Sequence, residues 1–372
     1  MAALAALDLP AGPELVDALR TVWERGDAVF PLDPRLPAPT RAAVLATMRP
    51  ATVIGADGEL PWTGGEPEPV ADGDALVVAT SGSTGKPKGV VLTHAAIAAH
   101  ARGVHERLAV DPARDRWLAC LPLAHMGGLG VVLRALVDGV GLDVVGSPDP
   151  ATVASAPAEL GSTLTSLVPT ALDRTDASAY RWIVLGGAAD PVERPANVVR
   201  TYGLTESGGG VVYWPGGPLP GVEVRVLDDE VQLRGPTLLR CYRDGTDPRC
   251  ADGWLPTGDL GELRADGLVV RGRRDEMIVS GGENVWPTAV EAVLDRHPAV
   301  REAAVIGRAD EEWGHRVVAL VVPADPAHPP TLEALRAAVR EELPAAAAPR
   351  ELELVDRLPR SALGKLLRDS LW

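Results

Sequence analysis

The first half of the chain alternates short apolar runs with stretches whose apolar residues recur at helical spacing. Short apolar runs bounded by turn residues predict buried strands, and a recurrence every three or four residues predicts helices. The strands are predicted at residues 75–80, 117–121, 142–145, 164–168 and 182–185, and the helices at 14–25, 93–102 and 129–137. Strands that alternate with helices indicate an α/β fold with layered subdomains.

The pattern changes in the second half. From Gly221 onward, short alternating strands separated by turns predict a β-rich subdomain. From about residue 276 a small α+β unit is predicted, with helices at 287–295 and 331–342 and strands at 300–306, 317–322 and 351–355. We therefore expect two domains, a large N-terminal domain at 1–274 and a small C-terminal domain at 276–372.

Composition narrows the class of protein. The chain has 372 residues, of which 46% are hydrophobic, so it can bury a sizeable core. With 51 acidic and 36 basic residues its net charge is -15, which argues against nucleic-acid binding because both partners would be polyanions. Three cysteines without metal-ligand spacing predict a reduced, cytoplasmic protein. The pattern also predicts no signal peptide and no membrane insertion.

One segment predicts a phosphate site. It comprises Thr80, Ser81, Gly82, Ser83, Thr84, Gly85, Lys86, Pro87, Lys88 and Gly89. Glycines let the backbone approach phosphate oxygens, hydroxyls donate hydrogen bonds, and the two lysines supply positive charge. The predicted strand runs directly into the segment and the predicted helix at 93–102 comes after it; strand, glycine-rich loop and helix in this order are the context that a phosphate site needs. Its spacing is not that of a Walker A loop. The alternative is a polar surface turn.

Four further segments follow the loop in order. They are Tyr202–Ser207 (YGLTES), Trp254–Leu260 (WLPTGDL), Gly272–Asn284 (GRRDEMIVSGGEN) and Pro359–Lys365 (PRSALGK). Together with the loop at 80–89, they resemble the signature segments of the acyl-adenylate-forming superfamily, which includes acyl-CoA synthetases, aryl-acid ligases and adenylation domains. The resemblance implies an ATP- and Mg²⁺-dependent enzyme with a large N-terminal domain and a small mobile C-terminal domain.

The resemblance assigns catalytic roles. A carboxylate that attacks the α-phosphate of ATP joins two anions, so cations and donors must face the developing charge. The matching family lysine bridges these groups, which makes Lys365 the expected catalytic cation; the alternative is a solvated terminal lysine. Thr205 is expected to contact the α-phosphate, and Glu206 is expected to hold Mg²⁺ as a hard oxygen ligand. Alone, Glu206 would be interpreted as a surface turn residue.

The resemblance also assigns the nucleotide contacts. Tyr202 and Gly203 are expected at the adenine. Asp259 is expected to accept both ribose hydroxyls, and Arg273 is expected to reach the ribose. Without the resemblance, Asp259 would be interpreted as a turn or helix-capping residue and Arg273 as a strand-edge arginine.

The segment after Arg273 is expected to serve the second half-reaction. Asp275 matches the hinge residue of the family. Gly281 and Gly282 match a face that lines the path of a thiol, which for an acyl-CoA synthetase is coenzyme A. Such a change of domain position requires a bistable hinge. A simple tight turn is an equally good interpretation of the glycine pair.

The segment LPLAHMGGLGVVLR at 121–134 is the part of the sequence that bears on the identity of the acid substrate. His125 is expected in the acyl pocket, or else as a packed structural histidine. Arg134 lies within an apolar run, where a cation needs an anionic partner. That partner is either a structural Asp or Glu or a second carboxylate on the substrate.

The order of residues in this segment resembles the o-succinylbenzoate–CoA ligase branch of the superfamily, whose substrate is a dicarboxylate. The segments at 166–172 and 185–189, with Gly186 and Gly187 expected beside the substrate, are shared with other branches. The alternatives are another acyl- or aryl-acid–CoA ligase, a freestanding adenylation enzyme, and a silent nucleotide-binding module. The expected partners are the acid, ATP and coenzyme A, and a homodimer is left open.

Two features depart from the family pattern. The stretch at 28–34 resembles a family segment that normally lies farther along the chain, so we expect a shortened N-terminus. Leu363 stands where the family carries a small or polar residue, and we expect this to affect packing more than chemistry.

Overall fold

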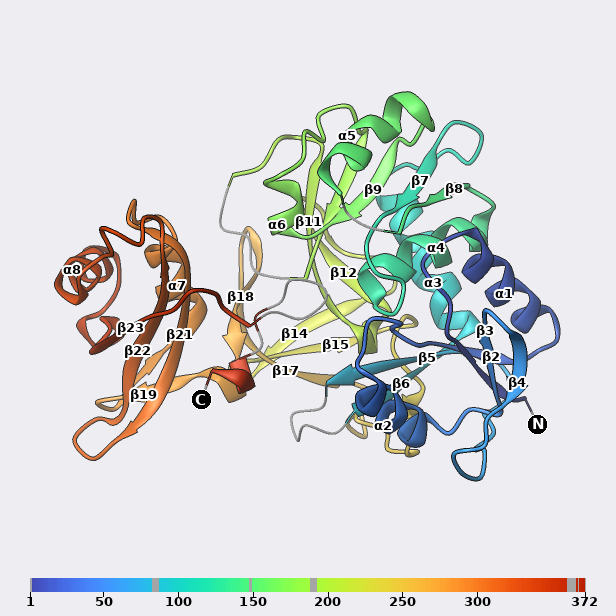
Figure 1. Cartoon of the computed structure of the whole chain (residues 1–372), viewed down its shortest axis with the longest axis horizontal. Coiled ribbons are helices and arrows are strands. Elements are labelled where there is room, and N and C mark those ends of the chain that lie inside the picture. Colours follow the sequence, from blue (N-terminus) through green and yellow to red (C-terminus); the bar gives the residue numbers. More distant parts are fainter. Residues whose placement is uncertain are drawn as a thin grey trace. The chain divides into compact units, whose positions relative to one another are not determined.

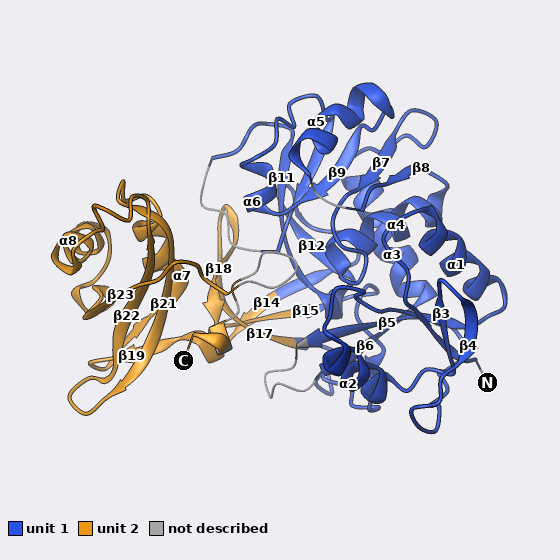
Figure 2. Ribbon diagram, in the orientation of Figure 1, with its two compact units in different colours: residues 1–224, 233–255 blue, residues 225–232, 256–372 orange. Residues whose placement is uncertain are grey.

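The computed structural model describes residues 2–81, 87–146, 149–187, 193–359, 366 and 368–371 (Figure 1). The chain divides into two compact units (Figure 2). Unit 1 comprises residues 1–224 and 233–255, and unit 2 comprises residues 225–232 and 256–372. The units divide near residue 255, whereas the domain boundary expected near 275 from the sequence pattern stays a prediction.

Unit 1 contains two seven-stranded sheets. The first has the order β16-β6-β5-β2-β1-β3-β4. Its strands are β1 (Leu4–Leu7), β2 (Ala28–Pro31), β3 (Thr52–Gly55), β4 (Gly58–Pro61), β5 (Asp74–Ser81), β6 (Pro87–Thr93) and β16 (Cys241–Tyr242). Helices α1 (Pro13–Glu24) and α2 (Ala38–Met48) accompany this sheet. Strands β1 and β2 are wholly buried and, with Phe30 and Met48, form part of a continuous apolar core.

The second sheet of unit 1 has the order β13-β12-β11-β10-β9-β7-β8. Its strands are β7 (Arg116–Ala119), β8 (Gly141–Val144), β9 (Leu164–Leu167), β10 (Trp182–Leu185), β11 (Val198–Leu204), β12 (Gly209–Trp214) and β13 (Gly217–Pro218). The helices are α3 (His94–Arg107), α4 (Met126–Asp138), α5 (Pro150–Glu159) and α6 (Pro169–Leu172). Strands β7 to β11 pair in parallel, as the alternation of strands and helices predicts.

The connection after β5 differs from the expectation. The predicted helix does not follow the phosphate loop directly, because β6 returns antiparallel to β5 with Thr80 opposite Lys88. Helix α3 begins only at His94, where the Thr93 hydroxyl caps it by accepting from the Ala96 amide. The loop therefore joins two strands, and its neighbouring backbone is held by the ladder of a hairpin and not by a helix terminus.

Unit 2 carries the later strands. The sheet β14-β15-β17-β18 is formed by β14 (Glu223–Leu227), β15 (Glu230–Arg234), β17 (Leu255–Arg264) and β18 (Gly267–Arg273). The C-terminal sheet has the order β20-β19-β22-β21, with β23 paired to β22. Its elements are β19 (Ile278–Ser280), β20 (Glu283–Val285), α7 (Pro287–Leu294), β21 (Val300–Asp310), β22 (Gly314–Pro323), α8 (Leu332–Glu342) and β23 (Glu351–Leu354). The inner faces of α7 and α8 pack on this sheet through Val290 and Leu335.

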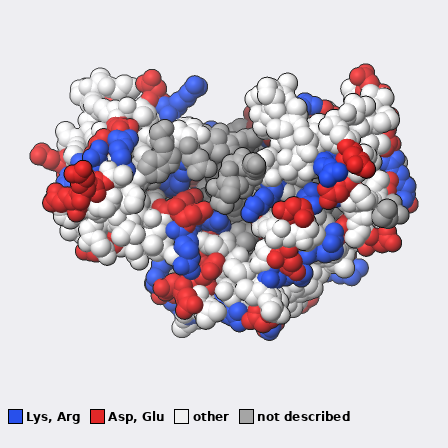
Figure 3. Space-filling view, turned by 90° about the horizontal axis from the view of Figure 1, so that it is seen from below, with Lys and Arg blue, Asp and Glu red and all other residues white. Residues whose placement is uncertain are grey.

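The surface is mixed in charge. On the face drawn in Figure 3, acidic and basic side chains are interspersed, in a chain whose net charge is -15. Among the described residues, the structure has no helix with the length and apolarity that a membrane span requires.

Candidate active site

In unit 1, one tyrosine connects the phosphate loop to the predicted Mg²⁺ ligand. Strand β16 pairs with β6, so Tyr242 lies opposite Val90 and close to Lys88. The Lys88 ammonium lies 5.1 Å from the centre of the Tyr242 ring. The Tyr242 hydroxyl donates to Glu206 Oε1 at 3.0 Å. A cation from the loop and a carboxylate from the YGLTES segment thus share one neighbour. The Thr80 hydroxyl donates to the Lys88 carbonyl at 3.4 Å, which keeps the strand ends together.

The YGLTES segment is held by its backbone. Strand β11 runs into a single 3₁₀ turn, Thr205–Ser207, and the Ser207 hydroxyl accepts from the Leu204 amide at 2.8 Å. The Leu239 amide donates to the Glu206 carbonyl at 2.7 Å. Gly203 lies at an irregularity between β11 and β12, where a Cβ would overlap the Gly209 carbonyl. This turn therefore presents the side chains of Thr205 and Glu206 from a fixed backbone.

In unit 2, three predicted residues form one charged cluster. Asp259 on β17 and Arg273 on β18 are opposite each other in the ladder. The Arg273 guanidinium lies 3.5 Å from Asp259 and 3.3 Å from Asp275, and it donates to the Thr257 carbonyl at 2.9 Å. Burial opposes the charge, but the two carboxylates outweigh it and raise the pKa of Arg273. The structure thus brings together the two predicted ribose residues and the predicted hinge residue.

The glycine pair forms a two-residue hairpin loop between β19 and β20. Gly281 and Gly282 have φ values of +61° and +81°, the left-handed region that such loops require. A Cβ on Gly281 would lie 2.8 Å from the Trp313 ring, whereas a Cβ on Gly282 would meet open space. An open hollow of about 710 Å³ lies beside the loop, lined by Trp313 and His315 among others. The tight-turn interpretation is therefore realised, and the thiol path stays a prediction.

Arg134 lies in a pocket with few polar groups. Only 5% of its surface is exposed, although it sits in the middle of α4. Its guanidinium stacks over the Trp117 ring at 4.5 Å, and Nη2 donates to the Ser166 hydroxyl at 2.8 Å. Its Nε is buried without a hydrogen-bond partner. Within the described residues, no Asp or Glu oxygen lies within 4.0 Å of the guanidinium, so the structural carboxylate partner considered for Arg134 is not among them.

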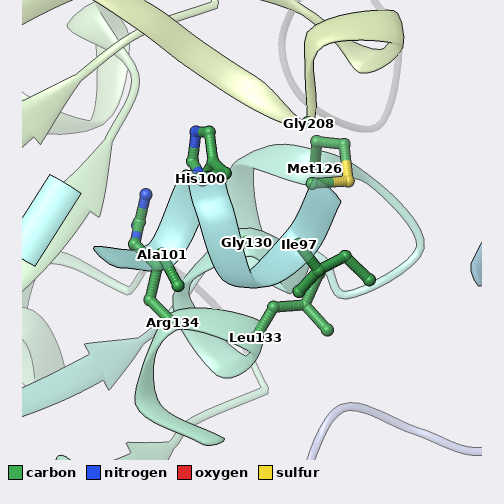
Figure 4. Close-up of a pocket in the computed structure, with 8 residues that line it drawn as sticks. All are labelled: Ile97, His100, Ala101, Met126, Gly130, Leu133, Arg134 and Gly208. Carbon is green, nitrogen blue, oxygen red and sulfur yellow. The ribbon is translucent and has the colours of Figure 1, made fainter. Parts of the chain in front are cut away.

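A small cavity adjoins this arginine. It measures about 10 Å³, about the room that one water molecule needs, and Figure 4 shows Arg134 and Leu133 of α4 facing it with His100 and Ile97 of α3. Burial lowers the pKa of His100 to about 3, so that histidine is neutral beside the cation. The buried Tyr213 hydroxyl also lacks a hydrogen-bond partner, and burial raises its pKa to about 12.

His125, at the start of α4, contacts the N-terminal segment. Its Nε2 lies 3.7 Å from Asp33, a buried carboxylate that Arg35 also contacts. Burial lowers the pKa of His125 even though the Asp33 charge opposes this shift. The ring is half-buried, which is compatible with both a pocket role and a structural role.

Several predicted residues fall outside what the structure describes. They are Gly82, Ser83, Thr84, Gly85, Lys86, Lys365 and the side chain of Ser81.

The remaining predicted residues, Gly186, Gly187 and Tyr202, are described. Gly186 and Gly187 follow β10, and Gly187 has a φ of +89°. A Cβ on Gly186 would lie 3.1 Å from the Thr201 hydroxyl. Tyr202 is partly buried on β11.

Sequence reasoning missed three residues of these clusters: Tyr242, Trp117 and Ser166. Trp117 lies in a short apolar run that predicts only a strand, and Tyr242 lies between two arginines in a stretch for which no element is predicted. Ser166 begins a segment that the resemblance singled out, but its contact with Arg134 spans 32 positions. Local pattern carries no signal for such pairs.

The chain matches two family models and several known proteins. Residues 56–242 match the AMP-binding enzyme family, and residues 289–365 match the AMP-binding enzyme C-terminal domain. A probable 2-succinylbenzoate–CoA ligase of Mycobacterium tuberculosis is 43% identical over 82% of this chain and 85% of that protein.

Solved structures extend the likeness to the whole chain. The o-succinylbenzoate CoA synthetase (MenE) of Bacillus subtilis, in complex with the acyl-adenylate intermediate OSB-AMP, has a TM-score of 0.88 at 29% identity. That match covers 99% of this chain and 88% of the other. The same enzyme in complex with ATP and magnesium ion has a TM-score of 0.85 at 28% identity, covering 99% and 89%. The chain therefore belongs to the AMP-binding enzyme family, among its AMP-forming acid–CoA ligases.

Proposed function

We propose that this enzyme is a 2-succinylbenzoate–CoA ligase that uses ATP, Mg²⁺ and coenzyme A. Its relatives carry that name, and the MenE structures contain the acyl-adenylate or ATP with magnesium. In the proposed reaction a carboxylate oxygen of the succinyl chain attacks the α-phosphorus of ATP, and pyrophosphate leaves. The coenzyme A thiol, which gives up its proton, then attacks the acyl carbon, and AMP leaves.

The observation that carries the choice of acid is the environment of Arg134. A buried guanidinium whose Nε has no partner needs an anion to offset its desolvation. Burial lowers the pKa of Arg134, but an arginine begins so far above neutrality that it stays charged at pH 7. A substrate with a second carboxylate supplies that anion; a monocarboxylic acid does not.

Entry of the aromatic ring requires the pocket to open. The cavity beside Arg134 has room for about one water molecule, so its lining must move to admit a benzoate. Met126 and Leu133 line it, and the unbranched methionine side chain is well suited to repacking. Gly130 and Gly208 complete the wall without side chains that would obstruct the ring.

The adenylation step falls to residues in each unit. In unit 1, Lys88 and the hydroxyl of Thr80 are the described part of the proposed phosphate loop, and Thr205 is proposed to contact the α-phosphate. Lys365 is proposed to neutralise charge as the carboxylate and phosphate meet. In unit 2, Asp259 is proposed to accept the ribose hydroxyls, with the Arg273 guanidinium 3.5 Å from its carboxylate.

Glu206 suits a Mg²⁺ ion bound together with phosphates. In nucleotide enzymes Mg²⁺ takes one or two protein carboxylates and completes its shell with phosphate oxygens and water. Among the described residues no three His, Cys, Asp or Glu side chains cluster as a protein-only metal site. A single carboxylate near a loop lysine is the arrangement that such a shared site needs. Mg²⁺ would neutralise phosphate charge there.

The second half-reaction uses the C-terminal segment. Asp275 is proposed as the hinge, and the turn at Gly281 and Gly282 as part of the path for the thiol. The partners are proposed to be small molecules only, in the cytoplasm where ATP and coenzyme A are available. Assembly into a homodimer is a further proposal of this function.

Pyrophosphate release tests the proposal. The enzyme is mixed with ATP, Mg²⁺ and each of a panel of acids: 2-succinylbenzoate, benzoate, fatty acids, and 4-oxo-4-phenylbutanoate, which lacks only the ring carboxylate. We expect release to be fastest with 2-succinylbenzoate. Faster release with a monocarboxylate would identify a different acid–CoA ligase, and no release with any acid would indicate a silent nucleotide-binding module.

A further inference from the structure

A chain of buried polar contacts leads from the end of α4 back to Arg134. Asp138 Oδ2 lies 2.6 Å from His105 Nδ1. On the other side of the imidazole, Trp117 Nε1 donates to His105 Nε2 at 3.2 Å. The Trp117 ring in turn lies under the Arg134 guanidinium, 4.5 Å from its centre. Trp117 is fully buried and His105 is 7% exposed, so water does not compete with the bond between these two rings, whereas Asp138 is partly exposed.

The donors and acceptors fix the protonation of His105. An indole N–H can only donate, so Nε2 must carry a lone pair and the ring proton must lie on Nδ1, facing Asp138. A second proton on Nε2 would point at the indole N–H and lose that bond. Burial lowers the pKa of His105; the hydrogen bond to Asp138 and the Asp138 charge oppose this shift, and the Arg134 charge adds to it, so that the net shift is downward and agrees with the neutral ring that the geometry requires.

This chain does two things to the indole. Its hydrogen bond to His105 holds the ring plane, so the face turned to Arg134 has one orientation. Donation from the N–H, strengthened by the Asp138 charge behind the imidazole, also increases electron density on the ring. A cation stacked on that ring is attracted more strongly. The Ser166 hydroxyl then fixes the guanidinium from the other direction, at Nη2.

We propose that Asp138, His105 and Trp117 are positioning residues that set the orientation of Arg134 toward the second carboxylate of the acid. The inference rests on the proposed function of Arg134. None of the three residues touches the substrate; they determine selectivity through the arginine. Arg134 and Asp138 are four positions apart on α4 and therefore lie on one helix face. Asp138 nevertheless pairs with His105 and not with the guanidinium.

The test compares two variants with two substrates. Trp117→Phe keeps an aromatic face but removes the N–H, and Asp138→Asn acts two contacts away at a side chain that is 25% exposed. We expect each variant to lower kcat/KM for 2-succinylbenzoate about threefold to tenfold, mostly through KM. Trp117→Phe removes a hydrogen bond and part of the cation–π contact, whereas Asp138→Asn keeps an acceptor for His105 and removes the charge that strengthens the chain. Turnover of 4-oxo-4-phenylbutanoate should stay at the wild-type level.

Two controls separate the explanations. Asp138 also lies 3.8 Å from the exposed Arg102 side chain. Arg102→Ala removes this contact and should leave kcat/KM unchanged for both substrates. In an Arg134→Met background, Asp138→Asn should cause no further loss, because the arginine it positions is gone.

The outcomes distinguish the proposed role of Arg134 from the positioning role of Asp138, His105 and Trp117. An equal fall for both substrates would show a structural role, and unchanged kinetics in folded Asp138→Asn would also overturn the positioning role. If Arg134→Met alone leaves the preference for 2-succinylbenzoate intact, the proposed function of Arg134 fails. If it removes the preference and Asp138→Asn does not reduce it, only the positioning role fails.

Discussion

Replacing Arg134 by methionine should remove substrate selectivity without a loss of stability. Arg134 is held by one hydrogen bond to the uncharged Ser166 hydroxyl and by the Trp117 ring, together worth about 2–4 kcal/mol. Against this stand the desolvation of the guanidinium and an unpartnered Nε, which costs about 1–3 kcal/mol by itself. Buried ion pairs replaced by apolar residues of similar volume often leave stability unchanged or raised by about 1–4 kcal/mol, and a buried cation without a carboxylate partner has less attraction to lose. We expect a free energy of unfolding within about 1 kcal/mol of the wild type, or higher.

The catalytic efficiency of Arg134→Met with 2-succinylbenzoate should fall, although its stability should not. Loss of one member of a buried charge pair costs about 2–5 kcal/mol, which corresponds to a fall of roughly 30-fold to several thousandfold in kcat/KM for 2-succinylbenzoate. Release of pyrophosphate with 4-oxo-4-phenylbutanoate should fall little or even rise, because that acid leaves the guanidinium without an anion. Urea unfolding and steady-state kinetics with both acids measure the two effects.

A second buried arginine provides the matched control. Arg243 is 7% exposed, close to the 5% of Arg134, but it donates to the backbone carbonyls of Met48 and Pro69 and to two others. Arg243→Met removes the donor from all four carbonyls, of which that of Arg49 keeps the Glu68 amide, and should cost about 3 kcal/mol or more. If Arg134→Met were as destabilising as Arg243→Met and lowered turnover of both acids equally, Arg134 would be a structural residue and the reasoning would be refuted.

Three further predictions address other parts of the molecule. Tyr242→Phe should lower the apparent affinity for Mg²⁺–ATP up to about tenfold, because Glu206 loses one hydrogen bond, and Glu206→Gln should lower that affinity much more. If both variants had the same effect in a Mg²⁺ titration of pyrophosphate release, Glu206 would not be the ligand. The folded-state pKa of His100 is depressed from 6.5 to about 3, so its contribution to stability is complete above pH 6.5 and is lost as pH falls toward 3. His100→Gln should therefore make the fall in unfolding free energy between pH 6 and 4 shallower by up to about 1.4 kcal/mol per pH unit. An unchanged slope would show that His100 is already accessible to protons. Gly281→Ala should lower the free energy of unfolding by about 1–2 kcal/mol more than Gly282→Ala, because both positions have positive φ but only the first meets the Trp313 ring; similar values in urea unfolding would show that Trp313 moves aside.

The sequence predicts much of the fold because several elements are marked by local pattern. The run at 182–185 is a strand over the predicted residues, and α7 begins at Pro287 where a proline at the first helical position predicts a start. Strand β6 was missed because Pro87 and Gly89 interrupt its apolar run, and only pairing with β5 reveals it. Short strands such as β3 and β4 have no long periodic segment to indicate them.

The candidate site was predictable as far as single residues carry their own signal. Arg134 stands out as a charge within an apolar run, and Glu206 stands out within a recognisable segment. Their neighbours do not, because the hydrogen bonds from Tyr242 to Glu206 and from Arg134 to Ser166 join residues 36 and 32 positions apart in the chain. Such contacts depend on sheet order and helix packing, which a single sequence does not specify.

We infer that this one enzyme activates a dicarboxylic aromatic acid and transfers it to coenzyme A. Competition measures this most directly: ATP, Mg²⁺, coenzyme A and equal amounts of 2-succinylbenzoate and 4-oxo-4-phenylbutanoate are supplied together, and the thioesters and nucleotides are quantified by mass spectrometry. We predict that 2-succinylbenzoyl-CoA and AMP form in equal amounts and that the thioester of the competing acid is minor. Predominance of the competing thioester, or formation of ADP in place of AMP, would contradict the account.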